Sequence, residues 1–237
     1  LGDHFGVGHI FLAGEAPGLF YGYVTQGIVQ KEDITENGIK YIKQDGSVGY
    51  YQTVNKTTPV AGDVKYVDRN GDGVVDDNDR DIIGNPNPDF TYGFQTKVSW
   101  KSLSLSASFN GVQGRDILNV GNRYNNTPGT KSNNVTRKAF QNMWTDENPS
   151  NLYPKSTFVV QNMVMDRYVE DGSYLRCSDI TLSYVLPAKW TNKIGIKNTS
   201  VYASVKNAFV ITDYSGYDPE VNSFAFDGLR PGVDMNS

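Results

Sequence analysis

A pair of long alternating segments constrains the fold of this chain more than any other feature. From Phe90 to Trp100, apolar or aromatic side chains alternate with polar ones, and after a turn at Lys101 the alternation continues to Phe109. Each segment has about ten residues, the length of a tilted strand that crosses a lipid bilayer. Aromatic residues gather near the segment ends, as is typical of the membrane–water interface. The pattern predicts an antiparallel hairpin with one lipid-facing side and one water-facing side.

A soluble β-sandwich is the alternative, because one face of its sheets also packs against a core. Strands of soluble proteins are usually only about five or six residues long, so the length of both segments favours a transmembrane barrel. No apolar run approaches the roughly eighteen residues of a membrane helix. A barrel needs no such run, because lipid-facing and water-facing residues alternate along its strands.

An acidic loop rich in glycine precedes the hairpin. Its residues have the spacing of positions 1, 3, 5, 7, 9 and 12 of an EF-hand calcium loop, with Gly73 at the sharp turn of position 6. The predicted calcium ligands are Asp68, Asn70, Asp72, Val74 (through its carbonyl), Asp76 and Asp79. Asp79 departs from the EF-hand pattern, which has a longer, bidentate Glu there, and neither flank has a helical pattern. An ordinary surface turn rich in Asp, Asn and Gly is the alternative, and both interpretations stay open.

Composition excludes several functional classes. The formal net charge of −4 gives no basic surplus for a nucleic-acid partner. The only histidines, His4 and His9, have a spacing that fits no metal or catalytic site. No nucleophile elbow, phosphate loop or dinucleotide fingerprint occurs, so we expect no enzyme. The single cysteine, Cys177, excludes an internal disulfide and is interpreted as a small packing residue.

Further strands are expected on both sides of the hairpin. Residues 174–186 and 197–211 alternate as the hairpin does, although Asn207 interrupts the second pattern on its apolar side. Residues 19–30 form a weaker candidate strand, because two glycines interrupt it. The remaining segments are expected to be polar connections. They would contain short strands near 39–43 and 64–67 and a short helix over 135–144.

The connections alternate between short and long. The short ones, 100–102 and 187–196, fit the periplasmic turns of an outer-membrane barrel, and the long ones, 31–87 and 113–173, fit its extracellular loops. The acidic loop would then lie outside the cell. About five strands cannot close a barrel, since the smallest natural ones have about eight. We therefore expect an all-β fold, an antiparallel segment of a larger transmembrane β-barrel with long extracellular loops.

The first residues do not look like a secretory signal. Residues 1–18 lack a charged segment followed by an apolar run, and Pro17 and several glycines interrupt them. We interpret the chain as a piece of a longer polypeptide.

Four stretches together resemble one family. The block GDVKYVDRNGDGVVDDNDRDIIGNPNPDFTYGF, which begins at Gly62, is similar to the late part of SusC/RagA-type TonB-dependent outer-membrane transporters. Three other stretches agree with it and follow the order of the family: GLFYGYVTQGIVQ at 18–30, YVEDGSYLRCSDITLSYVLPAKW at 168–190 and VYASVKNAFVITDYSGYDPEVN at 201–222. The resemblance covers nearly the whole chain.

The resemblance implies a barrel of about 22 strands that is filled by an amino-terminal plug. Such transporters import oligosaccharides or peptides with energy from the TonB system, and a SusD-like surface lipoprotein forms a lid on them. Residues 1–237 would be the carboxy-terminal portion of the barrel, without the plug and without the final strand. The TonB system would act through the missing amino-terminal part. The identity of the substrate does not follow from the sequence.

A multi-pass barrel in the cell outer membrane needs a polar lumen face that passes a hydrated solute. The residues expected on that face are Gln95, Lys97, Ser104, Ser106, Thr181 and Ser183. Two alternatives remain. One is a secreted, calcium-stabilised β-sandwich that binds glycans or mediates adhesion, and it would be soluble in plain buffer. The other is a passive porin, which would have neither a plug nor a TonB box upstream.

Overall fold

The chain divides into two compact units. The computed structural model describes residues 8–127, 134–156, 163–196, 199–224 and 226–235. The first unit, named the strand unit, comprises Pro88–Arg115 and Asp171–Ser215. The second, named the loop unit, comprises Leu1–Asn87, Asp116–Glu170 and Gly216–Ser237.

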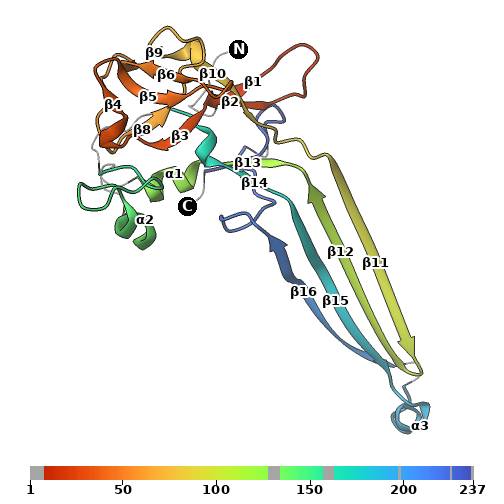
Figure 1. Ribbon diagram of the computed structural model, residues 1–237. Helices are drawn as coiled ribbons and strands as arrows, with labels where there is room; N and C mark the ends of the chain where they lie inside the picture. Colours follow the sequence, from red (N-terminus) through yellow and green to blue (C-terminus); the bar gives the residue numbers. More distant parts are fainter. Residues whose placement is uncertain (1–7, 128–133, 157–162, 197–198, 225, 236–237) are drawn as a thin grey trace. The chain divides into compact units, whose positions relative to one another are not determined.

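Four long strands form the sheet of the strand unit. They are β11 (Phe90–Trp100), β12 (Leu103–Gln113), β15 (Tyr174–Val185) and β16 (Ser200–Thr212). Each is antiparallel to its neighbour in the order β11-β12-β15-β16, and they lie side by side in Figure 1. Their lengths of 11, 11, 12 and 13 residues confirm the long strands that the alternation predicts.

Short connections join these strands in sequence. Two residues link β11 to β12, and the first, Lys101, has a φ of 54°. Tight two-residue hairpin loops use such left-handed backbone angles, because these angles match the twist of the strands. Between β15 and β16 the chain forms α3 (Ala188–Thr191) and the 3₁₀ turn η4 (Asn192–Ile194). Residues 197–198, where the last predicted strand begins, lie outside the described residues.

A bulge explains the exception at Asn207. The pairing register shifts between Cys177 and Asp179 on both sides of β15: Ser178 is an extra residue against β12, whereas Asn207 and Ala208 of β16 lie opposite Ser178. At this level of β16, Asn207 has a φ of 49°, a left-handed conformation that asparagine adopts more readily than most residues. The residue that breaks the apolar alternation is therefore a bulge residue and not a member of the regular ladder.

The long sheet has four described strands, whereas about five were expected. Residues 19–30 instead form β2 (Leu19–Tyr23) and β3 (Thr25–Ile28), which pair with other short strands of the loop unit. Gly27 has a φ of 89°, which a regular strand does not have. At Gly22 an added Cβ would lie 2.4 Å from the carbonyl oxygen of Val164. Gly22 thus permits close backbone packing and Gly27 a left-handed backbone angle, and both interrupt the strand.

The other described strands are short and form five small sheets. These are ordered β1-β2-β10, β3-β8, β4-β5-β6, β7-β9 and β14-β13-β17. The bounds not yet given are β1 (His9–Ile10), β4 (Ile34–Thr35), β5 (Gly38–Ile42), β6 (Val48–Tyr51), β7 (Thr53–Val54), β8 (Val64–Tyr66), β9 (Val74–Val75), β10 (Arg80–Gly84), β13 (Asp116–Asn119), β14 (Val169–Asp171) and β17 (Val233–Asp234). Strands β5 and β8 confirm the short strands predicted near 39–43 and 64–67.

A tyrosine-rich core packs the loop unit. Tyr41, Tyr51 and Tyr66 are almost fully buried, and the Tyr66 amide donates a hydrogen bond to the Tyr51 hydroxyl at 3.2 Å. The interpretation of 31–87 as a polar connection was therefore incomplete, because this segment contributes much of a buried core. Its strands have only two to five residues, which is too short for an alternating pattern to stand out in the sequence.

Two short helices also belong to the loop unit. They are α1 (Val120–Asn126) and α2 (Arg137–Asn142). The second confirms the helix predicted over 135–144 in a shorter form, and Thr136 caps it by accepting a hydrogen bond from the Ala139 amide at 3.1 Å. Three 3₁₀ turns complete the described elements: η1 (Lys31–Asp33), η2 (Asp77–Asp79) and η3 (Asp166–Tyr168). In the part of the chain that the structure describes, no helix is long and apolar enough to cross a membrane.

Candidate functional site

The pairing register places apolar side chains of all four long strands on one face. Four rows cross the sheet from β11 to β16: Trp100, Leu103, Tyr184 and Val201; Val98, Leu105, Leu182 and Ala203; Thr96, Ala107, Ile180 and Val205; and Phe94, Phe109, Cys177 and Phe209. Val98 and Trp100 are 64% and 68% exposed. A continuous, exposed apolar face of this kind needs an apolar environment to cover it. It therefore matches the hydrocarbon-facing side that the sequence predicts.

Aromatic residues mark both ends of β11. At the first end, the rings of Phe90 and Tyr92 lie 5.9 Å apart. At the other, the Lys101 ammonium lies 4.7 Å from the centroid of the Trp100 ring, so the cation and the ring occupy the same turn. Amphipathic rings and long basic side chains are typical of membrane–water interfaces.

The opposite face of the sheet is polar and contains the residues predicted to line the lumen. Its central rows are Gln95, Ser108, Asp179 and Lys206; Lys97, Ser106, Thr181 and Ser204; and Ser99, Ser104, Ser183 and Tyr202. The Asp179 carboxylate accepts hydrogen bonds from the Thr181 hydroxyl at 2.7 Å and the Ser204 hydroxyl at 2.8 Å. The register thus brings the six predicted lumen residues to one hydrogen-bonding surface.

The acidic loop is organised around two buried carboxylates. Asp68 is 2% exposed, and its two oxygens accept hydrogen bonds from the amides of Gly71 at 2.6 Å and Gly73 at 2.8 Å. Asp79 is 0% exposed and accepts bonds from the amides of Arg69 at 2.8 Å, Asn70 at 3.2 Å and Asp76 at 2.8 Å. Backbone amides therefore satisfy the carboxylates of Asp68 and Asp79, the first and last predicted calcium ligands.

The predicted calcium ligands between Asp68 and Asp79 are more exposed than these two residues. The Asn70 side-chain oxygen accepts a bond from the Asp72 amide at 2.8 Å, and Asp72 accepts one from the Val74 amide at 2.8 Å. Asp76 caps η2 by accepting from the amide of Asn78 at 2.8 Å. Among the described residues, no group of three or more His, Cys, Asp or Glu side chains is arranged to hold a metal ion. The calcium site therefore stays a prediction.

Burial controls the electrostatics of this loop. It raises the pKa of the Asp68 carboxyl, and the nearby Asp79 and Asp72 charges raise it further, whereas the amides of Gly73 and Gly71 lower it. The Tyr41 hydroxyl donates a hydrogen bond to the Asp68 carbonyl oxygen at 2.6 Å. Burial, followed by the charges of Asp68 and Asp79, raises the pKa of Tyr41 to about 12.

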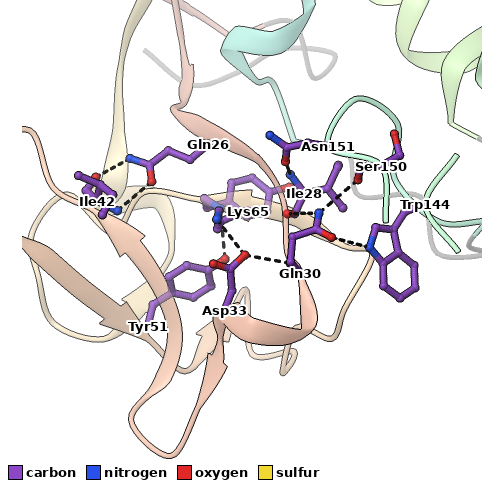
Figure 2. Close-up of polar contacts among 11 residues, drawn as sticks. Gln26, Ile28, Gln30, Asp33, Ile42, Tyr51, Lys65, Trp144, Ser150 and Asn151 are labelled. Atoms are coloured by element: carbon purple, nitrogen blue, oxygen red, sulfur yellow. Dashed lines mark hydrogen bonds and ion pairs between the residues drawn. The ribbon is translucent and has the colours of Figure 1, made fainter. Parts of the chain in front are cut away.

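A polar network in the loop unit was not predicted from the sequence. Figure 2 shows Gln30 at its centre: its side-chain oxygen accepts a bond from the Trp144 indole at 3.0 Å, and its side-chain nitrogen donates to the Ser150 carbonyl at 3.2 Å. The backbone amide of Gln30 donates a hydrogen bond to the Asp33 carboxylate. This carboxylate also forms a largely buried ion pair with Lys65, at 2.9 Å. Trp144 and Ser150 are 114 and 120 residues from Gln30 in the chain, so no local pattern signals these contacts.

His9 has a structural contact and not a site. Its Nε2 lies 3.1 Å from the carbonyl oxygen of Pro231, and its ring packs against Phe20 with centroids 5.3 Å apart. His4 lies outside the described residues. Cys177 is a buried, free cysteine within the apolar row, in agreement with a packing role.

Comparison with known proteins identifies relatives of one kind. No protein-family model matches the chain. It is 34% identical over 175 residues to TonB-dependent receptor P26 of Formosa agariphila, a match that covers 72% of this chain and 17% of the receptor. It is 33% identical over 214 residues to TonB-dependent receptor P3 of the same organism, covering 90% and 19%. It is 34% identical over 178 residues to TonB-dependent receptor SusC of Bacteroides thetaiotaomicron, covering 72% and 16%. The chain thus spans less than a fifth of the length of these relatives.

Solved structures show the same fold. The RagAB peptide importer in its closed-closed state matches with a TM-score of 0.59 and 23% identity, over 97% of this chain and 23% of that chain. A further structure of the RagAB peptide transporter matches equally well. The relatives named here are receptors and transporters, not enzymes. Sequence relatives, matching fold and two-faced sheet together assign this chain to the SusC/RagA-type TonB-dependent outer-membrane transporters, as a segment of their antiparallel transmembrane β-barrel.

Proposed function

We propose that this chain is part of an outer-membrane active transporter that imports glycans or peptides with TonB energy coupling and a SusD-like lid lipoprotein. The observation that supports it most directly is the two-faced sheet. One face is apolar apart from Thr96, and the other presents hydroxyl, amide and charged groups at the same levels of the same four strands. A barrel wall needs this combination to separate lipid from a water-filled path.

The polar face is suited to a hydrated cargo. Serine and threonine hydroxyls dominate its central rows, and each of them both donates and accepts hydrogen bonds. Asp179 and Lys206 place both signs of charge in one row, and Lys97 adds a second cation in the next row. These features suit sugars and peptides, whose own groups are mostly neutral donors and acceptors.

In this proposal the barrel crosses the cell outer membrane several times, and the chain forms the carboxy-terminal portion of it. The two-residue turn after Trp100 and the α3–η4 connection face the periplasm, because outer-membrane barrels have short periplasmic turns. The long segments 31–87 and 113–173 face the outside, where a SusD-like lid lipoprotein would bind. Peptide import by RagAB supports peptides as one of the two substrate classes.

Calcium in the acidic loop is a further part of the proposal. The exposed carboxylate of Asp72 and the half-buried carboxylate of Asp76 lie there, and the turns at Gly71 and Gly73 bring the loop residues close together. Calcium prefers several oxygen ligands and tolerates flexible geometry. An extracellular loop held by calcium would keep its shape outside the cell.

Transport is tested by uptake in cells. A strain lacking the gene for the full-length protein should lose uptake of at least one glycan or peptide, and the wild-type gene should restore it. Removal of TonB should abolish the same uptake, because the transport is energised. Uptake that persists without TonB would contradict active transport and favour a passive porin. A full-length protein that is soluble and monomeric without detergent would contradict the barrel and favour the secreted sandwich.

A further inference from the structure

A polar cavity of about 350 Å³ lies within the loop unit. It is partly open to solvent and is lined by residues of β3, α1, α2, η3 and the segment 151–153. Its volume falls in the range of small-molecule binding sites, which is about 300–1,000 Å³. The lining residues on which the inference rests are Asn126, Lys138, Asn151, Tyr153, Arg167 and Tyr168.

The charge of the lining has one sign. Lys138 and Arg167 line the cavity, and no aspartate or glutamate is among its described lining residues. The whole chain has a net charge of −4, so a cavity with two cations runs against the overall balance. No ion pair links Lys138 to any residue that the structure describes. The two cations favour an anionic group in the cavity, and Asp166, bonded to Thr25, and Glu170, bonded to Asn122, offset part of their potential.

The Arg167 guanidinium is only partly satisfied by the protein. One terminal nitrogen donates to the Leu152 carbonyl oxygen, whereas the other, Nη1, is buried and has no hydrogen-bond partner among the described residues. The guanidinium carbon lies 5.8 Å from the centroid of the Tyr168 ring, which helps to hold the side chain in place. Because Nη1 is buried, a ligand in the cavity would act on the guanidinium through its charge and not through a hydrogen bond to Nη1.

The neutral part of the lining suits hydroxyl groups. Asn151 uses its side-chain oxygen to accept a bond from the Ile28 amide at 2.8 Å, so its amino group remains as a donor, and Figure 2 shows this contact. Gly27 permits this position, because a Cβ there would lie 2.2 Å from the Asn151 oxygen. The half-buried Tyr153 and the buried Tyr168 also line the cavity. Amide groups, aromatic residues and cations together match the polar edges, flat faces and acidic substituent of a sugar acid.

We propose that this cavity binds an acidic sugar unit, with its carboxylate or sulfate near Arg167 and Lys138. That the ligand is also cargo rests on the proposed function, whereas the binding itself does not. Carboxylate and sulfate share the chemistry that the two cations recognise. Leu152 is the single aliphatic side chain in the described lining, which favours a hydroxylated ligand over an apolar peptide.

Titration calorimetry on the full-length protein in detergent tests this binding. The probes are a disaccharide that ends in a uronic acid, its sulfated counterpart, its neutral counterpart and an acidic dipeptide. We expect the acidic disaccharides to bind and the neutral one to bind at least about tenfold more weakly. Arg167→Gln should weaken binding by about tenfold, and Lys138→Gln, on an exposed helix position, by about threefold. Lys40→Gln, an exposed cation on β5 outside the cavity, is the matched control and should change nothing.

Lys138→Gln keeps the test valid if Arg167→Gln unfolds the loop unit. Equal affinity for the acidic and neutral disaccharides would overturn the proposal, as would unchanged binding in Lys138→Gln together with Arg167→Gln. Binding of the acidic dipeptide without binding of either acidic sugar would also overturn it. Acidic-sugar binding in a protein whose deletion leaves all uptake intact would support the site and contradict the transport function.

Discussion

Phe94 and Phe109 lie directly opposite each other on β11 and β12, with ring centroids 4.5 Å apart and ring planes inclined by 15°. Phe209 of β16 lies in the same row, 6.4 Å from Phe109 between centroids. Cys177 of β15 stands between Phe109 and Phe209 in this row, and its small side chain lets the two rings approach across it. Aromatic cross-strand pairs of this kind contribute roughly 0.2–1 kcal/mol and help to fix the register of a sheet.

The different character of the two faces predicts that the same substitution destabilises the protein strongly on one face and little on the other. Ala107 lies on the apolar face at the middle of β12, and Ser106 lies on the polar face beside it. Ala107→Arg should reduce the free energy of unfolding in lipid vesicles by about 2–4 kcal/mol, because it buries a charge in hydrocarbon. Ser106→Arg should change it by less than about 1 kcal/mol, because its side chain remains in water. Chemical unfolding followed by tryptophan fluorescence measures both, and equal losses would refute the assignment of the faces.

Two variants should distinguish calcium binding by the acidic loop from the folding of that loop. Asp72→Ala removes an exposed carboxylate, so it should abolish calcium binding in calorimetry while the loop stays folded. Asp79→Ala removes the acceptor of three backbone amides and should destabilise the loop by about 2–4 kcal/mol even without calcium. Limited proteolysis of residues 68–79 reports the second effect. A wild-type protein that does not respond to calcium at millimolar concentration would show that the loop relies on its amide contacts alone.

The buried tyrosines predict a loss of stability in strong base. Burial and the Asp68 charge raise the pKa of Tyr41 from 10.0 to about 12. The unfolded chain releases this proton at lower pH than the folded chain, so the stability contribution is complete below pH 10 and disappears as pH rises toward 12. Tyr41→Phe should remove this part of the pH dependence, at a cost of about 1 kcal/mol at neutral pH for the lost bond to the Asp68 carbonyl.

Ultraviolet titration of tyrosinate measures this difference directly. The difference between wild type and Tyr41→Phe should show one phenol that titrates near pH 12. Tyr50→Phe, at an exposed position of β6, is the matched control for the removal of a phenol. A Tyr41 difference signal centred at pH 10 would contradict the burial argument.

The sequence predicts an element well where its apolar–polar pattern is long, and poorly where the element is short. The strands around Phe94 and Ile180 have eleven or more residues, so their alternation repeats often enough to exclude other elements. The α1 helix was missed because it has seven residues and no apolar period, and only the cap at Asn119 signals it. The Gln30–Trp144 contact was missed because it joins segments that are remote in the chain. The spacing of the acidic loop was recognised, but not that Asp68 and Asp79 bind backbone amides.

Gly27 offers a sharp test of the loop unit, because two separate constraints act on it. Its φ of 89° is strained for any other residue, and an added Cβ would lie 2.2 Å from the side-chain oxygen of Asn151. Gly46 has a similar φ of 82° but open space around it, so Gly46→Ala measures the backbone strain alone, about 1 kcal/mol.

Gly27→Ala should cost about 2–4 kcal/mol, because it adds a steric clash to the same strain. The clash displaces Asn151 and breaks its bond to the Ile28 amide, so that amide should lose protection in hydrogen exchange measured by mass spectrometry. Gly46→Ala should leave the Ile28 amide protected. Equal protection at Ile28 in both variants would mean that Gly27 serves only its backbone angle, and that the position of Asn151 beside the cavity does not depend on it.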